Sequence, residues 1–482
     1  MRCTATSKGL LVLALGAVVL AGCNASGGGQ TGLPQGDRGS GLAGSAHRAS
    51  SSGLIQHVVV IVQENRSFNN LFLGYPGATT QSYGYTHKNV KVTLSPVDLA
   101  TTWDLEHNSN AYFKSCNGTG SIPGTNCRMN GFDKEKWYCG VGSEPKCPDQ
   151  YPPYSYVPQY EVQPYWNMAN QYVLADEMFS SDFDISSFIS HQYAIAAVNP
   201  NASVNYPTNA GLWGCPGGPP DQIDVLGNNR KIPNGTERPC WDPTTLGDEL
   251  DGAGLTWAYY ASAIKGSGSF NCGTSAIRGD NSKGRTGIWS AYQAIKHICY
   301  GPDWANIISP PSQFLTDIGN GKLRTVTWIT PTFANSDHGG SGSSSGPSWV
   351  TSVVDAVGES QFWDTTAIFI FWDDSGGWFD PVAPTYLDND GLGYRLPLLI
   401  ISPYAKEGYV SHVAYEHGSI LKFIEDQFGL GRLAASDSRA NSPEGDAFDF
   451  SAPPRKFVPF DAPLHKDYFL HQTDDRRVPD VN

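Results

Sequence analysis

The decisive stretch is Val58-Val59-Val60-Ile61-Val62, which runs directly into Gln63-Glu64-Asn65-Arg66-Ser67-Phe68. Five consecutive apolar, β-branched residues favour a strand buried on both faces, as in a mostly parallel sheet. The carboxylate of Glu64 and the amide of Asn65 therefore stand where that strand ends. Polar residues are common where strands end, so this stretch by itself predicts a strand and its end but no particular function.

A second run of the same kind, Ala367-Ile368-Phe369-Ile370-Phe371, leads into Trp372-Asp373-Asp374-Ser375-Gly376-Gly377. Side chains at the exits of parallel strands can meet in the crevice at the carboxyl edge of the sheet. Adjacent carboxylates repel each other unless a cation is near, and oxygen-rich clusters hold hard cations. The alternative is a plain Asp-Ser-Gly turn. The two motifs, Glu64-Asn65 and Asp373-Asp374, together favour a bound metal ion over the plain turn.

The overall composition is that of an acidic globular protein. The 482 residues are 16% charged and 40% hydrophobic, with a formal net charge of −14. This length suffices for one large α/β domain or two smaller ones. The absence of a basic run argues against a nucleic-acid partner, and the negative charge gives no electrostatic reason to bind anionic lipid.

The N-terminus predicts export. Arg2 and Lys8 precede a short apolar core at residues 9–20, so residues 1–22 are predicted to be a signal peptide. Leu20-Ala21-Gly22-Cys23 resembles a bacterial lipobox, which implies cleavage before Cys23 and membrane attachment through lipid on its thiol. The alternative is an ordinary secreted protein. Residues 23–53, rich in Gly and Ser, are predicted to form a flexible tether. We expect a lipid-anchored protein of the bacterial cell envelope, outside the cytoplasm.

Cysteine usage agrees with export. Of ten cysteines, Cys3 and Cys23 belong to the N-terminal segment, and the other eight lie between the two acidic motifs. An even set in an exported chain predicts disulfides, and the absence of a CxxC spacing argues against zinc. We expect nearest neighbours to pair, although sequence leaves the connectivity open. The candidates are Cys116, Cys127, Cys139, Cys147, Cys215, Cys240, Cys272 and Cys299.

The remaining pattern predicts an α/β fold. Further strands are expected at 173–175, 255–260, 325–329 and 396–401, and helices at 187–198, 246–253, 290–296, 349–357 and 419–428. Strands that alternate with helices favour a mostly parallel sheet sandwiched by helices. Residues 151–165 and 199–242 are predicted to form long ordered loops that disulfides help to fix in place. The catalytic domain is expected at residues 54–457, and residues 458–482 are expected to be an extended tail.

A serine pair begins the predicted helix at residue 187. Exposed N–H groups at a helix N-terminus suit a phosphate, and a hydroxyl there can act as a nucleophile when a metal lowers its pKa. Either Ser186 or Ser187 could play this part, and a plain capping serine is the structural alternative. His107, His338 and His417 could each donate to a phosphoryl oxygen or protonate a leaving group, and His338 follows a predicted strand end.

Taken together, the motifs resemble the bacterial phosphoesterase family of phospholipases C and acid phosphatases, in the alkaline-phosphatase-like superfamily. The similarity runs from about Ile55 to Phe457. The stretches that carry it are Glu64-Asn65-Arg66-Ser67-Phe68, Met129-Asn130-Gly131-Phe132, Trp372-Asp373-Asp374-Ser375-Gly376-Gly377-Trp378-Phe379-Asp380, Arg395-Leu396-Pro397-Leu398-Leu399-Ile400-Ile401-Ser402-Pro403 and Phe448-Asp449-Phe450.

The resemblance implies an alkaline-phosphatase-like α/β core, one metal ion and a serine that takes the phosphoryl group. It matches Ser187 to the nucleophile, and His107 and His338 to histidines that contact the phosphate. Glu64, Asn65, Asp373 and Asp374 match the metal and phosphate site. The implied substrate is a phosphate ester or a phospholipid.

The sequence also departs from the family pattern. Pro381 stands where a histidine is usual, Asn69 replaces a usual Asp, and Ser190 replaces a usual Asn. These changes leave the proposed ligands intact and put substrate detail in question. Pro381 also favours a rival hypothesis, a non-catalytic surface lipoprotein that binds phospholipid or sugar on the same fold.

Overall fold

The computed structural model describes residues 53–139, 150–183, 186–198, 235–262 and 289–473, with short stretches at 204–207, 214–215, 223–225 and 227–230 and residues 148, 272, 475 and 477. The predicted signal peptide, Cys23 and nearly all of the predicted tether lie outside these residues, as does Cys147. Within the described part of the chain, every helix is too short or too polar to cross a bilayer.

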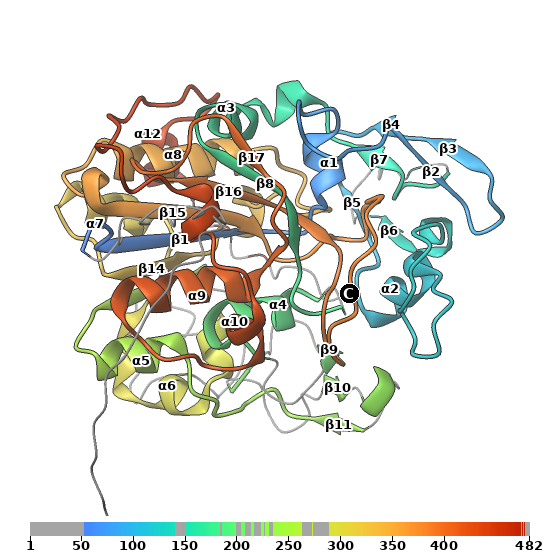
Figure 1. Cartoon of the computed structure of the whole chain (residues 1–482), viewed down its shortest axis with the longest axis horizontal. Coiled ribbons are helices and arrows are strands. Elements are labelled where there is room, and N and C mark those ends of the chain that lie inside the picture. The colour runs from blue at the N-terminus through green and yellow to red at the C-terminus, as the bar shows by residue number, and fades with distance from the viewer. Residues whose placement is uncertain are drawn as a thin grey trace, which may run out of the picture. The chain divides into compact units, whose positions relative to one another are not determined.

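One large sheet organises the described residues (Figure 1). Its strand order is β13-β12-β14-β1-β15-β16-β8-β17, and β18 also pairs with β8. The bounds are β1 His57–Gln63, β8 Val173–Phe179, β12 Trp257–Tyr260, β13 Ile307–Ile308, β14 Val326–Ile329, β15 Thr366–Trp372, β16 Arg395–Ile401, β17 Tyr409–Ser411 and β18 Tyr415–Glu416. The predicted strands are therefore confirmed, and each apolar run lies in the buried centre of the sheet.

The register of the central strands sets the position of the acidic motifs. β1 lies parallel to both β14 and β15, and Gln63 is opposite Trp372. The next residues, Glu64 and Asp373, therefore leave the sheet side by side. β16 runs antiparallel to both β15 and β8, so β8 again points the same way as β1. The exits of β14, β1, β15 and β8 all open at one edge, as expected for a mostly parallel sheet.

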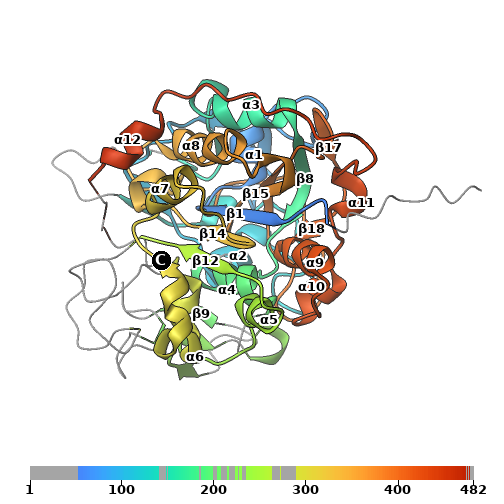
Figure 2. The same cartoon turned by 90° about the vertical axis from the view of Figure 1, so that its left-hand side faces the viewer.

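Helices cover both faces of this sheet (Figure 2). α3, α7, α8 and α12 lie on one side, and α4, α5, α9 and α10 lie on the other. The α-helices are α1 Phe68–Phe72, α2 Ser109–Cys116, α3 Gln163–Gln171, α4 Ser187–Ala196, α5 Leu246–Gly252, α6 Lys296–Tyr300, α7 Gln313–Gly319, α8 Gly346–Gly358, α9 His417–Phe428, α10 Ala435–Arg439, α11 Glu444–Ala447 and α12 Lys466–His471. The predicted α/β class, with a mostly parallel sheet between helices, is confirmed.

Several short strand pairs and 3₁₀ helices lie outside the main sheet. The pairs are β2 Tyr83–Tyr85 with β3 Lys91–Thr93, β4 Ser95–Pro96 with β7 Ser155–Tyr156, and β5 Trp103–Leu105 with β6 Trp137–Cys139, while β10 Ile223–Val225 joins β9 Val204–Pro207 and β11 Thr236–Glu237. The 3₁₀ helices are Phe132–Lys134, Gln159–Glu161, Asn228–Arg230, Ala291–Ala294, Pro302–Asn306, Phe333–Asn335 and Trp363–Thr365.

Disulfides join nearest neighbours in the described residues. The bonds are Cys116–Cys127, Cys215–Cys240 and Cys272–Cys299. Each follows the predicted pairing, whereas the predicted Cys139–Cys147 bond involves a residue outside the described part. The bonds close loops that carry little regular structure, where a cross-link restricts the unfolded chain.

Two local predictions were wrong. A single helix was expected at 290–296, but a 3₁₀ helix ends at Ala294 and α6 begins at Lys296 because Ile295 is extended and forms a parallel bridge with Trp241. The tail was expected to be extended, but it contains α12. That helix forms because Phe469 is buried against Trp349, with ring centroids 5.4 Å apart.

Candidate functional site

The acidic cluster consists of Glu64, Asn65, Asp373 and Asp374, and the fold brings all four together as predicted. The backbone N–H of Asn65 donates to Asp373 Oδ1 at 3.0 Å, and Asn65 Nδ2 donates to Asp374 Oδ2 at 3.2 Å. Asn65 can direct its backbone N–H and its side-chain amide toward Asp373 and Asp374 because its φ of 53° lies in the left-handed region. The turn after Asp374 is fixed by Gly376 N–H, which donates to Asp374 Oδ1 at 2.6 Å.

Ser187 reaches the same cluster from the exit of β8. It is the first residue of α4, and Ser186 is the N-cap residue. Ser187 Oγ accepts a hydrogen bond from Asn65 Nδ2 at 3.1 Å and donates to Asp374 Oδ2 at 3.2 Å. Of the two candidate serines, Ser187 is therefore the one whose hydroxyl contacts the acidic cluster.

His191 joins the cluster, although it was not among the predicted ligands. Its Nε2 lies 2.9 Å from Glu64 Oε1 and 3.8 Å from Asp373 Oδ2. Burial lowers the pKa of His191 to about 4 despite the charge of Asp373. A sequence signal did exist, because His191 stands four residues after Ser187 and so shares its face of α4. His417, at the start of α9, is also buried, and burial lowers its pKa to about 3, with the nearby His191 acting in the same direction.

The donor set of the acidic cluster fits a divalent cation. Tyr259 donates its hydroxyl proton to Trp289 O at 2.6 Å, so it can only accept from His191 Nδ1, 3.3 Å away. That arrangement turns the Nε2 lone pair of His191 toward the carboxylate of Glu64. A divalent cation bound between two facing acceptors would satisfy both of them without water, so this donor set fits such an ion. Imidazole and carboxylate are ordinary ligands for zinc-like ions, and carboxylates also suit harder ones.

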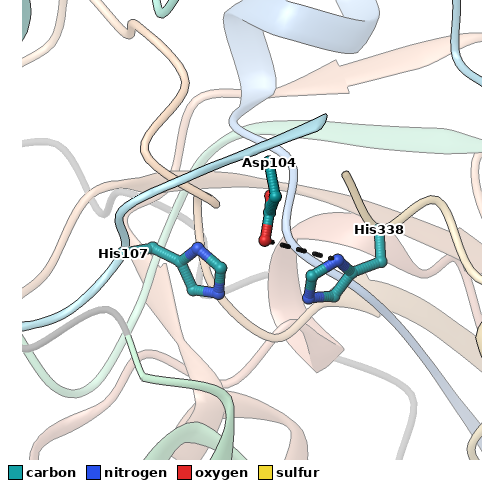
Figure 3. Close-up of side chains that lie close together, drawn as sticks. All are labelled: Asp104, His107 and His338. Atoms are coloured by element: carbon teal, nitrogen blue, oxygen red, sulfur yellow. Dashed lines mark ion pairs between the residues drawn. The ribbon is translucent and has the colours of Figure 1, made fainter. Parts of the chain in front are cut away.

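A second group, here called the histidine cluster, contains Asp104, His107 and His338 (Figure 3). Asp104 lies on β5, His107 follows that strand, and His338 follows the 3₁₀ helix after β14. The imidazole centroids of His107 and His338 are 5.5 Å apart, and Asp104 Oδ2 lies 3.9 Å from His338 Nδ1. The structure therefore brings the two predicted histidines together and adds Asp104, which the sequence did not single out.

The glycine turn after the acidic motif connects the two clusters. Gly377 has a φ of 71°, and a Cβ placed on it would lie 3.0 Å from both Leu105 Cβ and Glu106 O. The backbone of the β5 segment therefore packs directly on the turn that follows Asp374. Because Asp104 and His107 flank this contact, the histidine cluster borders the acidic cluster at the same sheet edge.

Pro381, which stands where the family pattern usually has a histidine, directly follows Asp380, which forms a buried ion pair with Arg395. Arg395 Nε donates to Asp380 Oδ1 at 3.1 Å, and Arg395 Nη2 donates to Asp380 Oδ2 at 3.1 Å. The backbone N–H of Asn69 also donates to Asp380 Oδ2 at 3.1 Å. Asp380 and Arg395 are fully buried, and the guanidinium lies over the ring of Phe68. Pro381 itself is partly exposed. These contacts tie the start of α1 to β16.

The sequence model of the phosphoesterase family matches residues 55–431, a span that contains both clusters and Ser187. The chain belongs to the phosphoesterase family. Curated relatives include the non-hemolytic phospholipase C of Burkholderia pseudomallei, 22% identical over 429 residues, which cover 78% of this chain and 55% of the relative. The hemolytic phospholipase C of Pseudomonas aeruginosa is 23% identical over 434 residues, covering 78% and 53%. This chain spans about half the length of these two relatives.

Phospholipase C A of Mycobacterium tuberculosis is similar over more of its length. It is 22% identical over 443 residues, which cover 84% of this chain and 79% of the relative. Among solved structures, a protein of the alkaline phosphatase superfamily from Vibrio parahaemolyticus aligns with a TM-score of 0.35 and 11% identity, covering 82% of this chain and 72% of the other.

Proposed function

We propose that this protein is a metal-dependent phosphoesterase, of phospholipase C or acid phosphatase type, that acts outside the cytoplasm through a phosphoserine intermediate. The observation that carries the proposal is the contact of Ser187 Oγ with Asn65 and Asp374, at the edge of a buried carboxylate–imidazole cluster. Membership of the phosphoesterase family and the phospholipase C relatives support it.

The residues of the acidic cluster would position and activate the nucleophile. One divalent cation held by Glu64, Asn65, Asp373 and Asp374 would supply positive charge beside Ser187 and lower the pKa of its hydroxyl. Ser187 Oγ would pass its proton to Asp374 Oδ2, to which it is hydrogen-bonded, and attack phosphorus. The new P–O bond forms as the ester bond breaks, and the leaving alkoxide takes up that proton and departs as the alcohol. Water then attacks the phosphorus of this intermediate, its hydroxyl stays on phosphorus and its other proton returns to Ser187 Oγ. The product is phosphate from a monoester or the phosphorylated head group from a phospholipid.

The remaining polar groups would stabilise charge on the phosphoryl oxygens. Asn65 Nδ2, 3.1 Å from Ser187 Oγ, is placed to donate to an oxygen of the phosphoryl group on that serine. His107 and His338 line the same sheet edge and would stabilise the opposite side of the transition state. Full burial of these groups strengthens each interaction, because the local dielectric constant is low.

A phospholipid or another phosphate ester is the proposed substrate, and the names of the relatives favour the phospholipid. The predicted signal peptide at residues 1–22 and a lipid on Cys23 would hold the enzyme at the cell-envelope membrane, close to such substrates. The disulfides of the described residues are consistent with an oxidising compartment.

The test compares Ser187→Ala with Ser186→Ala. Both variants and the wild type are assayed on p-nitrophenyl phosphate and on phosphatidylcholine, with and without chelator, and bound metal is measured. We expect Ser187→Ala to lower kcat by at least about 10³-fold while retaining metal, and Ser186→Ala to stay within about tenfold of wild type. Near-normal turnover by Ser187→Ala would refute the assigned nucleophile.

The rival hypothesis is a non-catalytic lipoprotein that binds phospholipid or sugar. It predicts that the metal-loaded wild type binds phosphatidylcholine vesicles or sugar without hydrolysing either phosphate ester. The intact acidic cluster and its contact with Ser187 favour the enzyme.

A further inference from the structure

Exposed aromatic side chains gather on two segments, the β2–β3 hairpin at residues 83–93 and the segment at residues 130–138, which runs into β6. We propose that these two segments, here called the aromatic–basic surface, dock on an anionic phospholipid bilayer. Of the eleven large apolar side chains exposed in the described residues, four lie here: Tyr85, Val90, Trp137 and Tyr138. Apolar groups that gather on the outside of a protein indicate a surface that contacts a partner or a membrane.

Hydrogen bonds hold the two segments side by side. His87 N–H donates to Asp133 Oδ1 at 2.8 Å, and the His87 ring lies 2.5 Å from Asp133 Oδ2. Asn130 Nδ2 donates to Asn89 Oδ1 at 3.2 Å. The tip of the hairpin is therefore attached to the second segment, and β2, β3 and β6 lie together on the right of Figure 1. The fold itself thus forms one surface from both segments.

The hairpin packs one face on the protein and turns the other to solvent. A Cβ placed on Gly84 would lie 2.6 Å from the ring of Tyr154, so this face is covered. Tyr83 and Tyr85 occupy the opposite face, because side chains alternate along a strand. Their ring centroids are 5.8 Å apart, and Lys91 Nζ lies 3.9 Å from the centroid of Tyr83. Aromatic rings and lysines of this kind are typical of membrane–water interfaces.

The local charge complements an anionic bilayer, although the whole chain carries −14. Of the acidic residues in these two segments, Asp133 is paired with His87 and Glu135 is buried. Lys136 lies 3.7 Å from Glu106, but its side chain remains 68% exposed. Charges farther away than about 10 Å are largely screened at 0.1 M salt, so the local cations dominate. The exposed lysines are Lys88, Lys91, Lys134 and Lys136.

The composition favours a bilayer over a protein partner. Protein interfaces are enriched in aromatic residues but depleted in lysine. In these two segments every basic residue other than His87 is a lysine. Lysine together with tyrosine and tryptophan is the combination found where proteins meet lipid head groups. A phospholipid surface therefore fits both the apolar and the charged side chains.

The aromatic–basic surface borders the candidate site. β6 pairs with β5, so Trp137 lies opposite Leu105 and Tyr138 lies opposite Asp104. His107 follows two residues after Leu105. A bilayer in contact with Trp137 would present its phosphate head groups beside the strand that leads to the histidine cluster. This use of the surface rests on the proposed function, whereas docking itself does not require hydrolysis.

The test measures binding to lipid vesicles. Every protein is the full chain with Cys23→Ser, which removes the predicted lipid anchor. Vesicles of phosphatidylcholine, alone or with about 30% phosphatidylglycerol, are sedimented with protein at about 0.1 M and about 0.5 M salt. We expect binding to the anionic vesicles that weakens at the higher salt. Lys88→Gln with Lys91→Gln should weaken it at least about tenfold, because each lysine near the surface contributes about fivefold in affinity.

Matched changes elsewhere provide the controls. Trp137→Ala should weaken vesicle binding, whereas Tyr160→Ala removes a ring that is 75% exposed outside the aromatic–basic surface and should not. Lys322→Gln with Lys456→Gln removes two exposed charges elsewhere and should also bind like the parent protein. Circular dichroism checks folding, and turnover of soluble p-nitrophenyl phosphate should be the same in all these variants.

The outcomes separate this inference from the proposed function. Absence of binding to anionic vesicles at low salt overturns the docking surface, as does equal binding by the parent protein and the double lysine variant. A dimer in sedimentation velocity that Trp137→Ala dissociates also overturns it, because the surface would then join two copies of the chain. Salt-sensitive binding that only the surface variants lose supports docking even if no phosphate ester is hydrolysed, a result that would count only against the proposed function.

Discussion

Gly376→Ala is the most informative single perturbation of the acidic cluster. Gly376 has a φ of 57°, and a Cβ placed on it would lie 2.9 Å from the carbonyl carbon of Asn65 and closer to the carbonyl oxygen. The left-handed backbone costs alanine about 1–2 kcal/mol, and an overpacked contact adds about 1–3 kcal/mol. The free energy of unfolding should therefore fall by about 2–5 kcal/mol.

The activity of Gly376→Ala should fall as well, because the new Cβ collides with the backbone carbonyl of Asn65 and not with a flexible side chain. Relief of the clash must move Asn65, whose side chain bonds both Ser187 and Asp374. A displacement of about 1 Å in a positioned group costs on the order of 10²-fold in rate. We expect a loss of this size in kcat/KM for p-nitrophenyl phosphate, measured at a temperature where the variant is folded.

Gly429→Ala provides the matched control. Gly429 caps the C-terminus of α9 with a φ of 67°, and no atom lies within 4 Å of the position a Cβ would take. This variant incurs only the backbone cost of about 1–2 kcal/mol and should keep full activity. Urea unfolding and steady-state kinetics are compared for both variants. Equal stabilities and equal activities would refute the argument that Gly376 is required by its contact with Asn65.

Two further predictions concern charged groups away from the clusters. Burial alone would lower the pKa of His297, but hydrogen bonds to Asp242 and Asp248 outweigh it and raise the pKa above 6.5. The stabilisation is therefore complete below pH 6.5 and is lost as the pH rises through the raised pKa. In urea unfolding, the stability advantage of wild type over His297→Gln should shrink as the pH rises above about 6.5, and an advantage that grows with pH would contradict this. Arg395→Met leaves the buried carboxylate of Asp380 unpaired and should cost about 3–5 kcal/mol in urea unfolding, whereas the double change Asp380→Asn with Arg395→Met should cost less.

The fold was largely predictable because its signals are local. Runs such as Val58 to Val62 are apolar without alternation, which only a strand buried on both faces explains. Short helices were missed. α3 is nine residues long with Pro164 in its first turn, and residues 151–165, which include its start at Gln163, were predicted to be a long loop. Its formation depends on packing against the sheet layer rather than on a strong helical pattern.

The candidate site was only partly predictable. The acidic cluster could be anticipated, because parallel strands bring their exits to one edge even when Asn65 and Asp374 are 309 residues apart. The only sequence signal for His191 was its helical spacing from Ser187, and Asp104 could not be anticipated from the strand exits. Asp104 comes from a short strand outside the main sheet, and its approach to His338 depends on the contact of β5 with the glycine turn.

The sequence by itself determined the fold class, the strand exits at Glu64 and Asp373, and the serine at the start of a helix, because hydrophobic periodicity and capping act over a few residues. Only the tertiary structure decided the neighbour relations. The register of Gln63 with Trp372, the hydrogen bonds of Ser187 and the separation of the polar groups into an acidic and a histidine cluster all depend on packing between distant segments. That packing is a property of the whole chain, so no local pattern encodes it.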